Sequence, residues 1–408
     1  MMSAAMSGAP KSSPLTRPRL PARPFPFLHF VRTLRREIRI GPGFGRAPIL
    51  VILTPTRRRL DAPLEGERTV KAIVIREFGP PEVMRLEEVP TPVPQAGEVL
   101  VQVCAVSVNR TLDLVVRSGA YSLPVQLPHV LGVDPSGVIA ALGPGVAGRK
   151  IGDRVVTMQF VRPATATSFP VVLGLHAWGG YAEYVKVPAE ITHPIPEGVD
   201  FSAATVVARH APVAFTMLRD DAKLKAGDWL LVMGAAGGLG SAGIQAAKVL
   251  GAKVIAGAGA EERVRAAVGL GADFGVNYRM QDLAEEVKRI TGGRGVDVVF
   301  ENIGDPELFP KAFSSLARGG RLITAGGHGG GTVPLDVKRL YLNANTVIGS
   351  FGRITHEDLE LALRAAAEGR YRVLIDRVLP LAEAAQAHRI VAARTGVGKI
   401  ILRPSAAP

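Results

Sequence analysis

The sequence predicts an α/β protein in which a doubly wound parallel sheet follows a β-rich domain. Three observations support this prediction. Short strands alternate with Gly/Pro turns over residues 70–200, apolar strands alternate with helices after residue 201, and a glycine-rich loop follows the first of those apolar strands. With 408 residues, the chain is long enough for two domains with full hydrophobic cores.

The amino-terminal segment 1–69 is basic, and we expect it to be a disordered extension. Residues 1–60 hold 12 of the 49 Lys and Arg residues but only one of the 36 acidic residues, Glu37. The remaining chain is nearly neutral, which argues against nucleic-acid binding by the folded part. An organelle transit peptide and a nucleic-acid-binding arm are the alternatives for this segment. Its apolar run "APILVILTP" is too short to cross a bilayer, so we expect no membrane association.

The β-rich part begins at Val70 with the alternating run "VKAIVI" and continues through "GEVLVQVCAVSVN", "SGVIAALGPGV" and "GGYAEYVKVP". Short strands with Gly/Pro turns are typical of an antiparallel, partly closed barrel. Cys104 is the only cysteine, which excludes an intrachain disulfide. We therefore expect a reducing compartment, the cytoplasm.

The second part of the chain predicts strands that alternate with helices. The predicted strands are 229–233, 253–257, 274–278, 297–301, 321–325 and 346–350, and the predicted helices are 239–250, 261–269, 281–290 and 306–317. The last segment ends in the strand "GKIILRP" and is too short to fold alone, so we expect it to return to the β-rich domain. The predicted domains are therefore 70–200 with 353–408, and 201–352.

The stretch "LLVMGAAGGLGSAG" joins the first apolar strand to a helix and predicts a dinucleotide-binding loop. Glycines allow backbone N–H groups to approach a pyrophosphate, and the helix N-terminus offers its partial positive charge to the anion. The alternative is a glycine turn that only lets the helix pack close to the sheet. The predicted cofactor-binding residues of this loop are Gly234, Gly237, Gly238, Leu239 and Gly240.

The end of the second predicted strand favours NADPH over NADH. An acidic residue there would hydrogen-bond the ribose hydroxyls of NAD, but this chain has Gly257 and Ala258. Arg263 lies one turn into the next helix, where it is either a partner of the 2′-phosphate or a solvated helix residue. We therefore expect NADPH as the cofactor.

The order of a β-rich domain, a glycine-loop domain and a short returning segment resembles the medium-chain dehydrogenase/reductase superfamily, as do the strings "LPHVLGVDPSGVIAALGPGV" and "LKAGDWLLVMGAAGGLGSAGIQAAKVLGAKVIA". The resemblance implies a GroES-like catalytic domain, a Rossmann domain and a homodimer formed through the last Rossmann strand, near 346–350. Family proteins begin near "VKAIVI", which suggests that residues 1–69 are a gene-calling artefact.

The zinc ligands of the alcohol dehydrogenases in that superfamily are missing here. The position of the first cysteine ligand falls at Asn109 or Arg110, the histidine of the "G-H-E" string is Val133, and the second cysteine position falls near Arg209. Valine and arginine cannot ligate a cation. We therefore expect no zinc, which places the chain nearest to the quinone oxidoreductase and enone reductase branch.

The resemblance to that branch implies further cofactor contacts. In its NADPH-binding members a basic residue and a Tyr contact the 2′-phosphate, and these positions match Arg263 and Tyr278. A basic residue in the last strand contacts the pyrophosphate, and Lys399 matches it.

The chemistry predicted from these features is hydride transfer to a quinone or an α,β-unsaturated carbonyl, which requires a hydrogen-bond donor at the carbonyl oxygen. The candidate catalytic residues are Asn109, Arg209 and His210, with Tyr121 as a possible proton donor. Each has a structural alternative: a turn residue for Asn109, a buried pair with Asp134 for Arg209, and a packing residue for His210. Alternative functions are an alcohol dehydrogenase or enoyl-CoA reductase activity, and a non-catalytic NADPH-binding module.

Overall fold

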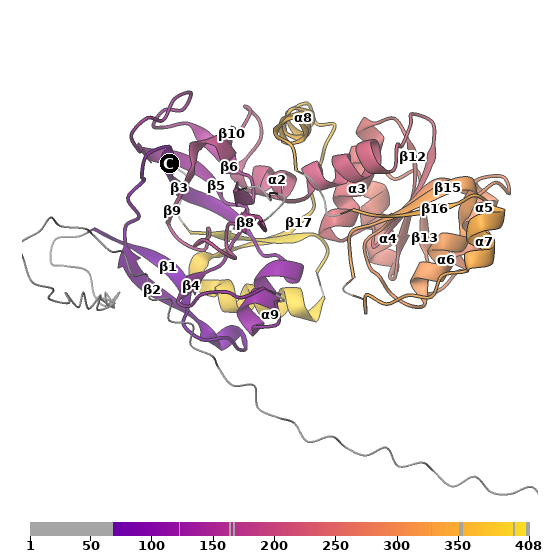
Figure 1. Ribbon diagram of the computed structural model, residues 1–408, viewed down its shortest axis with the longest axis horizontal. Helices are drawn as coiled ribbons and strands as arrows, with labels where there is room; N and C mark the ends of the chain where they lie inside the picture. Colours follow the sequence, from indigo (N-terminus) through magenta and orange to yellow (C-terminus); the bar gives the residue numbers. More distant parts are fainter. Residues whose placement is uncertain are drawn as a thin grey trace, which may run out of the picture. The chain divides into compact units, whose positions relative to one another are not determined.

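The computed structural model describes residues 68–121, 123–162, 165, 168–327, 329–350, 354–394 and 396–404. The expected disorder of the basic extension concerns residues that lie outside this described part, apart from Arg68 and Thr69. Within the described part, the chain forms a β-rich lobe and a parallel-sheet lobe (Figure 1). None of the described helices is long and apolar enough to cross a membrane.

The β-rich lobe contains an antiparallel sheet, a larger mixed sheet in which β17 and β18 pair in parallel, and a small hairpin. One sheet has the order β2-β1-β4, and a larger one has the order β10-β6-β5-β3-β18-β17, with β9 also paired to β3. The strands are β1 (Thr69–Ile75), β2 (Met84–Pro90), β3 (Glu98–Ser107), β4 (His129–Val130), β5 (Ser136–Leu142), β6 (Arg154–Thr157), β7 (Phe160–Arg162), β8 (Val171–Val172), β9 (Tyr184–Pro188), β10 (Thr192–Pro194), β17 (Ile375–Pro380) and β18 (Lys399–Arg403).

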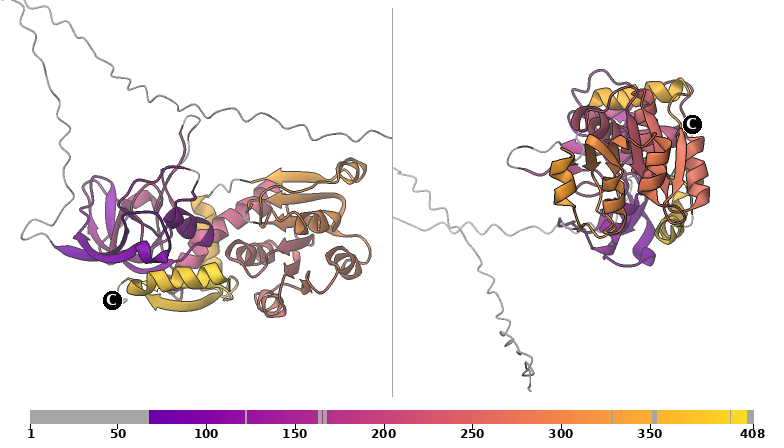
Figure 2. Two further views of the ribbon diagram at one scale, coloured as in Figure 1. Left: turned by 90° about the horizontal axis from the view of Figure 1, so that it is seen from below. Right: turned by 90° about the vertical axis from the view of Figure 1, so that its right-hand side faces the viewer.

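Short helices complete this lobe. They are η1 (Pro81–Val83), η2 (Arg110–Leu114), α1 (Val115–Ser118), η3 (Ala189–Ile191), η5 (Leu381–Glu383) and α9 (Ala384–Ala393). The carboxyl-terminal strand β18 pairs antiparallel with the end of β3, where Ile401 faces Ser107 and Leu402 faces Val106. Figure 2 shows the same return of the last segment, in yellow, to the β-rich lobe. The segment "GKIILRP" thus pairs with a strand of the β-rich lobe, and the domain boundaries stay a prediction.

The parallel-sheet lobe confirms the doubly wound prediction, because its strand order is β13-β12-β11-β14-β15-β16 and every neighbouring pair is parallel. The strands are β11 (Trp229–Met233), β12 (Lys253–Ala258), β13 (Phe274–Asn277), β14 (Val296–Glu301), β15 (Leu316–Thr324) and β16 (Thr346–Gly349). The helices of this lobe are α3 (Gly238–Val249), α4 (Glu261–Gly269), α5 (Leu283–Ile290), α6 (Leu308–Ser314) and α7 (Val337–Leu342).

The largest error in the predicted boundaries lies between α6 and β15. A helix over 306–317 and a strand over 321–325 were expected, but β15 already begins at Leu316, so α6 must end at Ser314. The "ARGG" sequence after Leu316 reads as a turn, yet Gly320 lies so close to the carbonyl oxygens of Ala317 and Val296 that no side chain fits there. Leu316 pairs with Val296 and Arg321 pairs with Val298 of β14, so "ARGG" forms an irregular bulge within β15 that is not itself paired with β14.

Helix α2 (Phe201–Phe215) lies at the junction of the two lobes. Asp200 caps its N-terminus by accepting from Ala203 N at 2.8 Å, and the helix continues into η4 (Thr216–Asp221). The hydroxyl of Thr205 bonds to Ser136 Oγ at 2.8 Å in the β-rich lobe, whereas α3 of the parallel-sheet lobe packs against another part of α2. This helix therefore carries any side chain that must reach both lobes.

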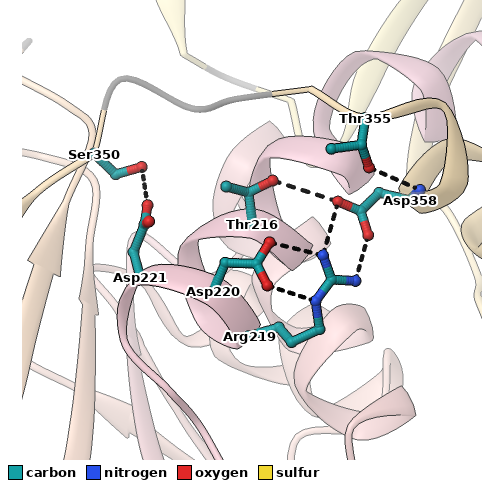
Figure 3. A network of polar contacts seen from close by, with 7 residues as sticks. All are labelled: Thr216, Arg219, Asp220, Asp221, Ser350, Thr355 and Asp358. Atoms are coloured by element: carbon teal, nitrogen blue, oxygen red, sulfur yellow. Dashed lines mark hydrogen bonds and ion pairs between the residues drawn. The ribbon is translucent and has the colours of Figure 1, made fainter.

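A polar network fixes η4 to α8 (His356–Ala367), the helix that follows the parallel sheet (Figure 3). Arg219 donates to Asp358 Oδ1 at 2.6 Å and to Asp220 Oδ1 at 2.7 Å, and Asp358 is 1% exposed. Thr355 caps α8 by accepting from Asp358 N, and Ser350 bonds to Asp221 at 2.8 Å. These contacts fix both ends of the connection from β16 to α8.

Candidate active site

The glycine loop lies at the carboxyl end of β11, and its backbone geometry requires glycine. Gly234 has a φ of +61°, which L side chains rarely adopt, and a Cβ at Gly240 would lie 2.2 Å from the carbonyl oxygen of Gly234. Gly237 is the N-cap of α3, so no side chain of the cap satisfies the first N–H groups of that helix. A loop of this form leaves these donors available to an anion.

His210 of α2 lies directly against this loop. A Cβ on Gly238 would lie 2.5 Å from His210 Nε2, so only glycine leaves room for the imidazole ring. Burial lowers the pKa of His210 well below its usual value, and the positive charges of Arg209 and Lys399 lower it further. The structure therefore brings a predicted catalytic residue and a predicted cofactor-binding residue together, and the imidazole is neutral.

Asn109 is the centre of a buried polar cluster at the end of β3. Its amide Nδ2 lies 3.1 Å from Ser107 Oγ and 3.2 Å from Asp134 Oδ2, and its Oδ1 accepts from Lys399 Nζ at 2.7 Å. Asp134 also accepts from Ser107 N at 2.9 Å and from Ser107 Oγ at 2.5 Å. Both ends of the Asn109 amide are thus engaged within the protein, so its role is not that of a simple turn residue.

Lys399 lies in this cluster, at the start of β18, with 8% of its surface exposed. Its ammonium donates to Val108 O at 3.0 Å as well as to Asn109 Oδ1. Burial lowers the pKa of Lys399 to about 8; Asp134 and Asp113 raise this pKa, whereas Arg209 lowers it. The pyrophosphate contact that the resemblance implies for Lys399 stays a prediction.

Arg209 neighbours the same cluster from α2. Burial lowers the pKa of its guanidinium, while Asp134, Asp113 and Tyr121 raise it. Its Nε is buried and has no hydrogen-bond partner among the described residues, and no ion pair within 4.0 Å joins it to Asp134 there. The expected alternative of a closed Arg209–Asp134 pair is therefore not formed, and Arg209 keeps hydrogen-bond donors for a ligand.

A second layer of buried polar residues lies behind Asn109, and sequence reasoning missed it. Asp113 Oδ2 accepts from Asn109 N at 2.7 Å and from Tyr181 OH at 3.2 Å, and that hydroxyl lies 3.2 Å from His388 Nε2. Burial, followed by the charge of Asp134, raises the pKa of Asp113 to about 6. The only sequence signal for this layer was the acidic residue four positions after Asn109.

The end of β12 forms a basic region next to Tyr278. A Cβ on Gly259 would lie 3.1 Å from Tyr278 OH. Burial raises the pKa of Tyr278, whereas the charges of Arg279, Arg263 and Arg394 lower it. Arg263 donates to the backbone oxygen of Arg394 at 2.5 Å. Sequence reasoning named Arg263 and Tyr278 but missed Arg279 and Arg394, which follow no periodic signal.

An open pocket of about 220 Å³ lies in the β-rich lobe, and Tyr121 is one of its lining residues. Burial raises the pKa of Tyr121, and the charge of Arg209 lowers it, which places the phenol within electrostatic reach of that guanidinium. The pocket is lined by Phe78, Val116, Gly119, Tyr121, Leu123, Pro124 and Val125.

The residues at the three predicted metal positions do not fit zinc. The Asn109 amide is fully engaged, Val133 is completely buried and apolar, and Arg209 carries a positive charge. Over the described ranges, no group of three His, Cys, Asp or Glu side chains could hold a metal ion. The donors that zinc requires are therefore not gathered here.

The comparisons with known proteins agree with this architecture. A family model for the alcohol dehydrogenase GroES-like domain matches residues 95–197, and one for zinc-binding dehydrogenases matches residues 238–368. The quinone oxidoreductase of Sus scrofa is 32% identical over 344 residues, which cover 83% of this chain and 98% of that protein. The chain belongs to the medium-chain dehydrogenase/reductase superfamily. Its fold is thus a GroES-like domain joined to a Rossmann domain, within the quinone oxidoreductase-like branch.

This chain is also similar to solved structures of alcohol dehydrogenases. An NAD-dependent alcohol dehydrogenase is 36% identical with a TM-score of 0.76, over 82% of this chain and 99% of that one. A cobalt- and zinc-bound thermostable alcohol dehydrogenase from Pyrobaculum aerophilum is 30% identical with a TM-score of 0.73, over 83% and 100%. The chain is thus an oxidoreductase of a superfamily whose members bind NAD(P).

Proposed function

We propose that this medium-chain dehydrogenase/reductase reduces a quinone or an α,β-unsaturated carbonyl with NADPH and without zinc. The contact of His210 with Gly238 carries this proposal, because it joins the polar cluster to the loop that would hold the cofactor pyrophosphate. A dinucleotide bound at the N-terminus of α3 would lie beside His210, which follows Arg209 on α2 and is within electrostatic reach of Lys399.

The basic region at the end of β12 supports NADPH as the cofactor. Gly257 and Ala258 offer no carboxylate to the ribose, whereas Arg263, Arg279 and Tyr278 offer donors to a 2′-phosphate. The negative charge of Asp305 raises the pKa of Tyr278. The Oδ1 of Asp305 accepts hydrogen bonds from the backbone N–H groups of Glu307 and Leu308.

The chemistry follows from the residues next to the loop. NADPH, when bound, supplies a hydride to the acceptor. Negative charge then develops on the acceptor oxygen, and Arg209, with its unused donors and charge, is placed to stabilise it. His210 is neutral and lies beside Gly238. The residues that line the pocket at Tyr121 are all uncharged, which suits an uncharged acceptor better than a charged one.

The direct test is stopped-flow oxidation of NADPH against a panel of quinones, enones and enoyl-CoA esters, with alcohols plus NADP⁺ as the reverse arm. We expect turnover with quinones or enones, and no dependence on added or chelated zinc. Turnover confined to alcohols with stoichiometric zinc in tag-free protein would favour the alcohol dehydrogenase alternative. Tight NADPH binding with no turnover in either arm would favour the non-catalytic module.

We further propose that the chain forms a homodimer through β16. This strand is the edge of the parallel sheet, and Val347 on it is 37% exposed. Helix α7 next to it exposes three large apolar side chains, Val337, Tyr341 and Leu342. An exposed edge strand with an apolar surface beside it is a pairing site. Light scattering after size exclusion tests this: a dimeric mass is expected, and a monomer after Val347→Lys.

A further inference from the structure

The reduction of an enone or a quinone needs a proton as well as a hydride, and the residues named so far do not supply it. Asn109 is a neutral amide whose donors already bind Ser107 and Asp134. A guanidinium such as that of Arg209 does not release its proton in proteins. His210 is neutral, and burial raises the pKa of Tyr121, which keeps its phenol protonated. Among the groups of the cluster itself, the ammonium of Lys399 is the one that still has a proton to give.

Lys399 has the geometry of such a group. Two of its three N–H bonds point to Val108 O and Asn109 Oδ1, which leaves one N–H without a protein acceptor among the described residues. Its charge acts on both Arg209 and His210, so the ammonium lies within electrostatic reach of the residue that touches the glycine loop. Lys399 thus belongs to the Asn109 cluster by its hydrogen bonds and lies within electrostatic reach of the residue beside the cofactor loop.

We propose that the Lys399 ammonium is the catalytic acid of the reduction, an inference that rests on the proposed function. Hydride addition forms a C–H bond at the β-carbon of an enone, and the π electrons of the alkene move to the carbonyl oxygen as an enolate. The N–H bond of Lys399 then breaks while an O–H bond forms on that oxygen. The enol tautomerises to the saturated ketone, and the neutral amine takes up a proton from water.

The surroundings of Lys399 suit this role. A general acid works best when its pKa lies near the operating pH, and burial brings that of Lys399 down to about 8. The charged groups that face it are Asp134 and Asp113, which favour the ammonium, and Arg209, which disfavours it. His210 is neutral and adds no charge. Lys399 is therefore protonated at neutral pH, yet close to releasing its proton.

The test compares Lys399→Met and Lys399→Arg with the wild type on an enone that the wild type turns over. We expect kcat to fall by about 100-fold or more in Lys399→Met, within the range of general acid catalysis. Lys399→Arg keeps the charge but holds its proton, so we expect a similar loss in kcat. Wild-type kcat/KM should fall above pH of about 8, and this limb should vanish in both variants. Lys311→Met, an exposed substitution on α6, is the matched control and should leave activity unchanged.

A second measurement does not depend on turnover. Competitive acetylation read by mass spectrometry gives the titration midpoint of a lysine, and we expect a midpoint near 8 for Lys399. Suppose that the wild type reduces enones, that Lys399→Met keeps kcat within about threefold of the wild type, and that its kcat/KM still falls at alkaline pH. Lys399 is then not the acid, and the proposed function still stands. If the wild type binds NADPH but reduces nothing on the panel, the proposed function itself is wrong. The melting temperature of each variant reveals a folding defect, and its NADPH affinity reveals a lost pyrophosphate contact. A variant that is normal in both measurements but slow in turnover has lost proton transfer.

Discussion

The glycine loop and the Asn109 cluster lie next to each other but are built in opposite ways. The loop uses backbone atoms of residues 234–240, a single continuous stretch. The cluster uses the side chains of Ser107, Asn109, Asp134 and Lys399, which come from distant parts of the chain. The loop holds an anion by leaving donors open, whereas most donors and acceptors of the cluster are already paired with one another. The loop proposed to bind the cofactor is therefore formed by one local stretch of sequence, whereas the cluster proposed to carry the chemistry is assembled only by the tertiary structure.

This difference has a physical origin. A helix N-terminus carries its partial charge wherever a glycine turn allows a ligand to approach, so few side chains are needed. A buried group such as Asp113 or Lys399 is costly unless charges and donors from elsewhere in the chain surround it. Substitutions in the loop should therefore act by steric clash, whereas substitutions in the cluster should act by changing its charge.

The largest expected effect is in the loop, with Gly240→Val. The new Cβ would lie 2.2 Å from Gly234 O, a backbone atom that cannot move without distorting the turn. We expect a cost of about 3 kcal/mol, or roughly 100-fold weaker NADPH binding. Fluorescence titration with NADPH measures it. Gly269→Ala, in α4 with no atom within 4 Å of the new Cβ, is the matched control and should bind as the wild type does. Equal affinities in both variants would contradict the steric account.

In the cluster, Asp113→Asn should change stability through charge, with the volume kept constant. The pKa of Asp113 is raised from 3.8 to about 6 in the folded state. Its contribution to stability is therefore present below pH 3.8 and is lost as the pH rises through 6, which amounts to up to about 3 kcal/mol.

The neutral amide avoids that loss. Urea unfolding at pH 5 and pH 7.5 should show Asp113→Asn to be more stable than the wild type at pH 7.5, with a smaller difference at pH 5. A variant that is less stable at pH 7.5, with the same pH dependence as the wild type, would show that hydrogen bonding at Asp113 outweighs its charge.

The smallest expected effect is at the basic region beside Tyr278, with Arg263→Ala. Removing one charged donor to a phosphate typically costs 1.5–3 kcal/mol, so we expect NADPH affinity to fall by about 10-fold or somewhat more. NADH affinity should not change, because NADH has no 2′-phosphate. Arg265→Ala, on the same helix with a side chain that is 69% exposed, is the control. A parallel loss for both cofactors would show that the contact of Arg263 with Arg394 O matters more than the phosphate.

Most of the fold was predictable because its signals are local. The strand 229–233 and the helix 261–269 were predicted with the boundaries that the structure gives them, and the doubly wound order follows from alternating strands and helices. The start of β15 was not predictable, because Leu316 pairs with Val296 of β14 ahead of the unpaired bulge "ARGG", and that pairing depends on a distant part of the chain.

The sequence by itself determined the superfamily, the glycine loop, and the absence of cysteine and histidine at the expected metal positions, since each depends on residue type and short spacing. Only the tertiary structure decided that the Asn109 amide is engaged at both ends, that His210 rests on Gly238, and that Lys399 joins the cluster. The physical reason is that β18 pairs with β3, although all the strands of the parallel sheet lie between these two strands in the sequence. This pairing brings a lysine 290 positions away to the amide that it bonds.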